Sequence, residues 1–155
     1  MPIPPFVAEL RTLIGTRELW LPGVTAVVRR GDDLLLTKRA DNGEWSPVTG
    51  IVDPGEEPGV TAARESLEEA GVEVTVDRLV SVRVIPDVVY ENGDRAAYLD
   101  LTFACTWVSG DARVADDENV EVRWWPIAGL PTMTDSIRQR IDDALAGETA
   151  ARFRR

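Results

Sequence analysis

Residues 58 to 70 carry charged and apolar side chains at the spacing of a helix. The segment reads PGVTAARESLEEA, and Gly71 follows it directly, where glycine commonly ends a helix by adopting a left-handed backbone conformation. We therefore predict a helix of about three to four turns, from about Pro58 to Ala70.

The two sides of this predicted helix differ in their chemistry. At about 100° per residue, Glu65, Glu68 and Glu69 project from one side. Like charges three and four positions apart repel one another, so this side requires a positive partner. The opposite side is expected to face the core and carries Val60, Ala63, Leu67 and Ala70.

The carboxylate cluster predicts a cation site. Carboxylate oxygens are the ligands of hard divalent cations, which favours Mg²⁺, with Mn²⁺ as a substitute, over zinc. The chain has no histidine, which excludes histidine metal sites and nucleophilic catalysis by Ser-His or Cys-His pairs. The alternative is a solvated acidic face, because most acidic runs on helices are of that kind.

The rest of the chain reads as a scaffold around this helix. Apolar spacing predicts an amphipathic helix from about Pro5 to Gly15, and a last helix from Thr132 or Thr134 to Gly147. Runs of β-branched or alternating residues predict strands at about 23–30, 34–38, 72–90, 95–107 and 120–126, and Trp45 opens another strand that leads to Gly50. We expect the third run to break at Pro86-Asp87 and to be joined to the fourth by a turn at Asn92-Gly93. We expect an α/β fold in which a mixed sheet lies between helices as an α/β/α sandwich, with an extra N-terminal helix.

Length and charge limit the organisation of the molecule. The chain has 155 residues, of which 44% are hydrophobic, and this predicts a single domain. We expect an accessory helix and lead-in over residues 1–22, the main domain over 23–147, and a mobile tail over 148–155. The formal net charge of −10 argues against a nucleic-acid-binding surface.

The single cysteine and the absence of long apolar runs bear on the compartment. Cys105 lies in the apolar run LTFACTW and is expected to be a buried strand residue, which fits a reducing cytoplasm. No run approaches about 18 apolar residues, and the first residues lack a signal-peptide pattern. We expect a soluble cytoplasmic protein with no membrane partner, as a monomer or homodimer.

Residues 50 to 72 resemble the Nudix box, which has a glycine, five residues, a glutamate, seven residues, and then Arg-Glu-aliphatic-any-Glu-Glu-any-Gly-aliphatic. The matching positions are Gly50, Glu56, Arg64, Glu65, Glu68, Glu69, Gly71 and Val72. Two places depart from the pattern. Ser66 replaces the aliphatic residue and can bond back to the carbonyl four residues earlier, and the lead-in reads WSPVTG.

This resemblance implies the Nudix fold and a Mg²⁺-dependent pyrophosphohydrolase. The implied substrate is a nucleoside diphosphate linked to another moiety, such as a nucleoside triphosphate or an ADP-ribose-like conjugate. The alternative is a catalytically silent domain that binds or senses a nucleotide. By analogy, Glu56 and Arg64 form a structural ion pair, with Arg64 also counted among the catalytic residues. The implied metal ligands are Gly50, through its carbonyl, and Glu65, Glu68 and Glu69.

Residues outside the box are further candidates. Lys38 and Arg39 end the predicted hairpin, where basic residues are usually solvated, but the resemblance places this pair near substrate phosphate. Tyr98 is a candidate for stacking on a base, against the alternative of a core residue. Glu65 is the candidate general base, and Glu118, in the acidic loop 116–118, is the outside candidate for base or ligand.

Overall fold

The computed structural model describes residues 3–155, and within them one mixed sheet organises the chain. Its strands are β1 (Leu19–Arg30), β2 (Asp33–Arg39), β3 (Trp45–Ser46), β4 (Val48–Ile51), β5 (Glu73–Val89), β6 (Arg95–Ser109) and β7 (Asn119–Pro126). The central order is β3-β2-β1-β6-β5, with β4 paired to β1 and β7 paired to β2. The β1–β6 pair is parallel and the other pairs are antiparallel, so the predicted mixed sheet is confirmed.

Two strands share one edge of β1. β2 pairs with β1 only at Arg29 and Arg30, and β4 pairs with the same edge from Gly23 to Ala26. This separation brings Gly50, on β4, opposite Val24 near the middle of the sheet. The box glycine is therefore held by strand pairing.

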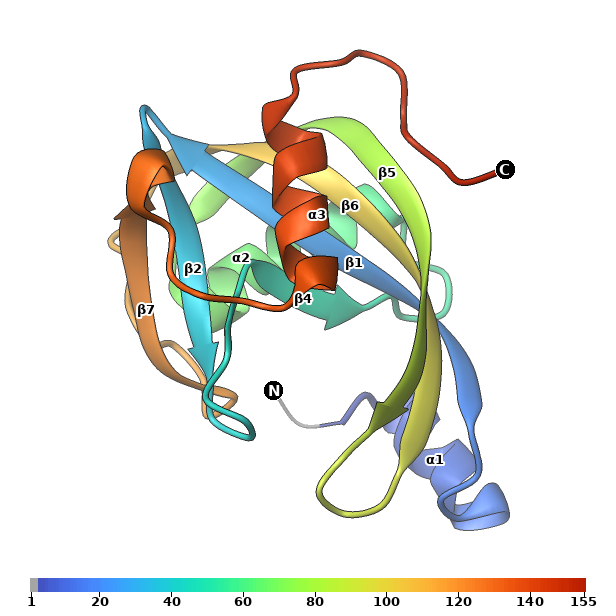
Figure 1. Cartoon of the computed structure of the whole chain (residues 1–155). Helices are drawn as coiled ribbons and strands as arrows, with labels where there is room; N and C mark the ends of the chain where they lie inside the picture. The colour runs from blue at the N-terminus through green and yellow to red at the C-terminus, as the bar shows by residue number, and fades with distance from the viewer. Residues whose placement is uncertain (1–2) are drawn as a thin grey trace.

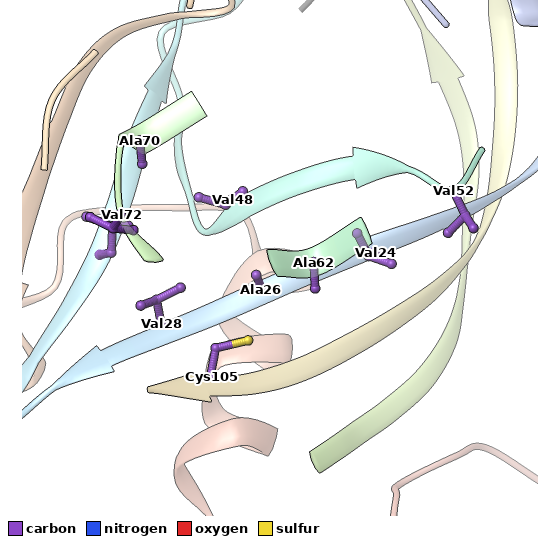
Figure 2. Packing of buried hydrophobic residues seen from close by; sticks show 10 residues of the cluster. Val24, Ala26, Val28, Val48, Val52, Ala62, Ala70, Val72 and Cys105 are labelled. Carbon is purple, nitrogen blue, oxygen red and sulfur yellow. The ribbon is translucent and has the colours of Figure 1, made fainter. Parts of the chain in front are cut away.

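Helices cover both faces of the sheet, as Figure 1 shows for α2 behind it and α3 in front. The helices are α1 (Pro5–Ile14), α2 (Pro58–Ala70) and α3 (Asp135–Leu145), with a short 3-10 turn over Ile127–Gly129. Figure 2 shows Ala62 and Ala70 of α2 packed with valines of β1 and β4 and with Cys105 of β6. The predicted α/β/α sandwich and the buried position of Cys105 are both confirmed.

A buried polar network joins α3 to the sheet. The guanidinium of Arg140 donates to Thr25 Oγ1 at 2.7 Å, and Thr25 donates in turn to the carboxylate of Asp100 at 2.8 Å. Thr102 donates to the other oxygen of the same carboxylate at 2.8 Å. The charges on Arg140 and Asp100 thus offset each other under α3.

The predicted core side of α2 is wrong at two positions. Val60 is 58% exposed and Leu67 is 51% exposed. The helix instead packs through small residues spaced four apart, Ala62, Ser66 and Ala70, which allow its backbone to approach the sheet closely. This rotation buries Glu65 and Glu69 and leaves only Glu68, of the three glutamates, in solvent.

The expected break at Pro86-Asp87 is a bulge inside one long strand. β5 runs on through both residues, and its register to β6 shifts between Ile85 and Val88. Asp87 there has a φ of 54°. A bulge accommodates proline because the missing N–H is not needed for a ladder bond.

Both terminal segments of the described chain contact the sheet. Val7 of α1 is buried against Leu21 and Ala96, whereas Leu13, on the predicted apolar face, is 79% exposed. Arg152, in the predicted mobile tail, is bonded to the outer edge of β5 through its own N–H and carbonyl. No helix among the described residues is long and apolar enough to cross a membrane.

Candidate active site

Local sequence fixes the helix that carries the acidic residues. Pro58 occupies the first turn, where its missing N–H costs no helical hydrogen bond. Gly71 ends the helix with a φ of 70°, as its position predicts. The hydroxyl of Ser66 donates to the carbonyl of Ala62 at 2.8 Å, so the departure from an aliphatic residue is satisfied within the helix.

Glu65 and Glu69 are carboxylic acids buried one turn apart. Glu65 is fully buried, and burial raises its pKa to about 7. Burial, with the nearby charge of Glu118, raises the pKa of Glu69 to about 9. Both groups differ from an exposed glutamate in their pKa, because burial disfavours the charged form of the carboxyl group.

The Glu65 side chain lies directly against Gly50. A Cβ at position 50 would overlap the carboxyl group, so only glycine allows this approach. The Oε2 atom of Glu65 is buried and has no hydrogen-bond partner among residues 3–155. A buried acceptor in this state is costly unless a ligand satisfies it.

Arg64 joins the loop before the helix to the acidic residues. It forms two hydrogen bonds with Glu56, at 2.8 and 2.9 Å, so the predicted ion pair is present. Its other terminal nitrogen lies 3.0 Å from both Glu65 and Glu68. The guanidinium lowers the pKa of Glu56 to about 2.

The loop between β6 and β7 adds carboxylates to Glu69. Oxygens of Glu69, Asp116 and Glu118 lie within 4.8 Å of one another. Asn119 donates to Glu69 Oε2 at 3.1 Å and is itself buried. Sequence reasoning missed Asn119 and Asp116 as site residues, because no spacing relative to the box marks them.

The structure separates the two basic candidates on β2. Lys38 lies over the ring of Trp45, at 5.9 Å from its centroid, on the face of the sheet covered by α3. Arg39 follows a register shift and is bonded to Asp41 at 2.7 and 2.9 Å. Asp41 is the largest cause of its raised pKa, and Glu118 contributes through its charge. Arg39, and not Lys38, is therefore the one beside the acidic cluster.

Tyr98 lies at the edge of this region. Its ring packs against Gly23, because a Cβ added to Gly23 would lie 3.2 Å from the Tyr98 Cδ1 atom. Its hydroxyl is hydrogen-bonded to the hydroxyl of Tyr90. Burial raises its pKa. Tyr98 is thus part of a packed tyrosine pair next to the β1 and β4 glycines, and its ring is largely covered.

The donor set fits a hard divalent cation. Every candidate ligand is a carboxylate or carbonyl oxygen, the buried Glu65 Oε2 lacks a partner in the described chain, and the missing side chain at Gly50 lets this carboxyl group lie against β4. A cation bound beside these groups favours their ionised forms. The geometry thus suits a bound divalent cation.

Comparison with known proteins finds relatives over most of the chain. The NUDIX domain family matches residues 19–145. A MutT-like protein of Streptomyces ambofaciens is 35% identical over 122 residues, covering 78% of this chain and 73% of its own. A NAD-capped RNA hydrolase NudC of Stutzerimonas stutzeri is 30% identical over 114 residues, and this match covers 72% of this chain and only 38% of that relative.

A solved structure agrees with the fold. The NUDIX hydrolase from Nitrosomonas europaea superposes with a TM-score of 0.69 at 27% identity, covering 86% of this chain and 93% of that one. The similarity therefore extends well beyond the box.

Proposed function

The chain belongs to the Nudix hydrolase family, and from this membership we propose that it is a Mg²⁺-dependent pyrophosphohydrolase. Its substrate would be a nucleoside diphosphate linked to another moiety. The observation that carries the proposal is the fully buried Glu65, which has an oxygen without a partner in residues 3–155 and lies against Gly50 beside buried Glu69.

The metal would be held by Glu65, Glu68 and Glu69, with the Gly50 carbonyl as a further donor and with Asp116 and Glu118 approaching Glu69 from the loop. A bound divalent ion neutralises the phosphoryl oxygens and lowers the pKa of the attacking water. Arg64 orients Glu65 and Glu68 through its two 3.0 Å contacts, while its bidentate bond to Glu56 ties the preceding loop to the helix. Asn119 orients Glu69.

The residues of the chain suggest how the substrate is held. Arg39 is paired with Asn119 of β7, and the N–H of Ala40 donates to the Glu118 carbonyl at 2.8 Å, so this cation lies beside the loop that carries the acidic residues and suits contact with a phosphate. The tyrosine pair next to Gly23 would border the remainder of the substrate. A small nucleotide conjugate fits the overall charge of −10, because metal ions rather than a basic surface would bring the phosphates to the site.

The test is a substrate panel with and without metal. Nucleoside triphosphates, ADP-ribose-like compounds and dinucleotides with a diphosphate bond are incubated with millimolar Mg²⁺ or with EDTA, and the nucleotide products are separated. We expect Mg²⁺-dependent cleavage of at least one class, lost in Glu69→Gln. Calorimetric binding of a nucleotide without any product would instead support a silent binding domain.

Metal binding gives a second readout that needs no substrate. An ion that binds only the folded chain raises stability by about 2.7 kcal/mol at a hundredfold excess over Kd. Millimolar Mg²⁺ should raise the Tm of the native protein and raise that of Glu69→Gln less. Equal shifts in the two proteins would contradict the assigned ligand.

A further inference from the structure

Residues 110–115, which we call the α2 strap, connect β6 to the acidic loop and run across the C-terminal end of α2. The N–H of Arg113 donates to the carbonyl of Ala70 at 3.1 Å. The N–H of Ala115 donates to the carbonyl of Glu69 at 3.2 Å. The last carbonyls of a helix have no partner within the helix, and here the strap supplies donors to two of them.

The strap begins at a glycine that no other residue can replace without movement. Gly110 has a φ of 91°, and a Cβ there would overlap the carbonyl oxygen of Gly71 and lie 3.1 Å from the Val72 Cα. Both contacts are with backbone, which cannot move aside as the end of a side chain can. The indole N–H of Trp107 donates to the Gly110 carbonyl at 3.0 Å and fixes the same point.

Residue 69 therefore has two roles in one place. Its carbonyl accepts a bond from Ala115, and its carboxylate lies within 4.8 Å of the carboxylates of Asp116 and Glu118, which follow directly in the chain. Ala115, which bonds to the Glu69 carbonyl, is followed directly by Asp116 in the chain. A displacement of the strap should therefore move both loop carboxylates.

We propose that the α2 strap is the device that positions Asp116 and Glu118 against Glu69 for metal binding, and that Gly110 is its positioning residue. The inference rests on the proposed function, because it assumes that these carboxylates bind a divalent cation. Metal–ligand distances in proteins lie within about 0.2 Å of characteristic values, so a shift of the strap that moves two carboxylates should weaken binding without unfolding the domain.

The experiment measures the Kd for Mn²⁺ by calorimetry or electron paramagnetic resonance, together with the Tm in EDTA. Gly110→Ala is compared with Gly93→Ala. Gly93 has a similar φ of 85°, but a Cβ there meets only Thr16 at an ordinary 3.8 Å. Both variants carry the same backbone strain, and only the first forces the strap to move. We expect the Kd to rise at least about tenfold in Gly110→Ala and less than about twofold in Gly93→Ala.

A second variant keeps the proposal testable if Gly110→Ala folds poorly. Ala115→Pro removes the N–H that bonds to the Glu69 carbonyl, at an exposed position. It should also raise the Kd about tenfold. In an Asp116→Asn, Glu118→Gln background, Gly110→Ala should have a much smaller effect on the Kd, because both loop carboxylates that it displaces are already lost.

Two failures have different meanings. If the native protein does not bind Mn²⁺ at millimolar concentration, the proposed function is overturned. If the native protein binds Mn²⁺ and Glu118→Gln weakens binding, but Gly110→Ala and Ala115→Pro bind like the native protein, only the positioning role of the strap is overturned. An undiminished effect of Gly110→Ala in the Asp116→Asn, Glu118→Gln background would also overturn it.

Discussion

Glu65 and Glu69 occupy positions where a helix packed on a sheet would ordinarily bury apolar side chains. Both are nearly or fully buried, and burial raises the pKa of each. Such burial costs free energy in the metal-free protein, and a helix in a stable domain retains it only where the groups serve another purpose. The orphan oxygen of Glu65 indicates where that purpose lies.

Replacing single carboxylates should show which one acts on the attacking water. At saturating Mn²⁺, Glu65→Gln should lower kcat by more than about a hundredfold, because it removes the proposed ligand and the candidate base together. Glu121→Gln is the control, since Glu121 pairs with Arg123 at 3.7 Å. Should Glu65→Gln keep more than about a tenth of the rate while Glu118→Gln loses over a hundredfold, about 2.7 kcal/mol of barrier, the loop supplies the base.

The Arg64–Glu56 pair should contribute to stability as well as to orientation. The two side chains are 25% and 16% exposed and share a bidentate contact. A double-mutant cycle of Arg64→Ala and Glu56→Gln, read by urea unfolding, should give a coupling energy of about 1 to 3 kcal/mol. Exposed Glu57→Gln in the same cycle should couple by less than about 0.5 kcal/mol. Equal coupling energies for Glu56 and Glu57 would show that the Arg64–Glu56 contact adds no specific stability.

At the scale of elements, the site depends on how closely α2 approaches β4. The small ridge of Ala62, Ser66 and Ala70 brings the helix backbone near the sheet, and Gly50 then accommodates the Glu65 side chain. Neither feature works without the other. Larger side chains on the ridge would raise the helix away from β4, and a side chain at position 50 would displace the carboxylate.

A matched pair of glycine substitutions tests this contact. Gly50→Ala should destabilise the protein by about 1 to 3 kcal/mol, as overpacking does, and should weaken Mn²⁺ binding. Gly59→Ala, in the first turn of α2, meets only Val76 at 3.8 Å and should stabilise by about 0.4 to 1 kcal/mol without changing metal affinity. Thermal unfolding with and without Mn²⁺ measures both. Similar metal affinities for the two variants would refute the role of the Gly50 gap.

At the scale of the whole molecule, the buried acids couple stability to pH. Their pKa values are about 7 and about 9 in the folded chain, against an ordinary value of 4.5. Above about pH 6 the folded state therefore binds more protons than the unfolded state, and stability falls as pH rises. Glu56, whose pKa is lowered to about 2, stays ionised in both states over this range.

Between about pH 6 and pH 9 in EDTA, Tm should therefore decrease with pH. Each group that keeps its proton only in the folded state contributes up to about 1.4 kcal/mol per pH unit. Saturating Mg²⁺ should remove most of the decrease, because the ionised carboxylates then have a partner. Glu69→Gln in EDTA should flatten the profile, especially above pH 7. A native Tm that is constant or rises over this range would contradict the burial of protonated acids.

Local patterns determined much of the scaffold. Pro58 and Gly71 set the bounds of α2, because proline and glycine restrict the backbone regardless of tertiary context. The Asn92-Gly93 turn, with Gly93 at a φ of 85°, and the burial of Cys105 follow for similarly local reasons. The box spacing placed Arg64 within reach of Glu56, and the structure shows their bonds.

Only the tertiary structure decided which face of α2 is buried and which distant groups meet it. The sequence predicted Val60 and Leu67 in the core, because they are more hydrophobic than glutamate. In the structure, the close approach of α2 to β4 favours burial of the small residues, and Glu65 and Glu69 are buried with them. The same holds for Lys38 and Arg39, which a register shift sends to different surroundings. Asn119 and Asp116 reach Glu69 from a strand and loop some fifty residues away, and pairings of that range depend on the whole sheet rather than on any local pattern.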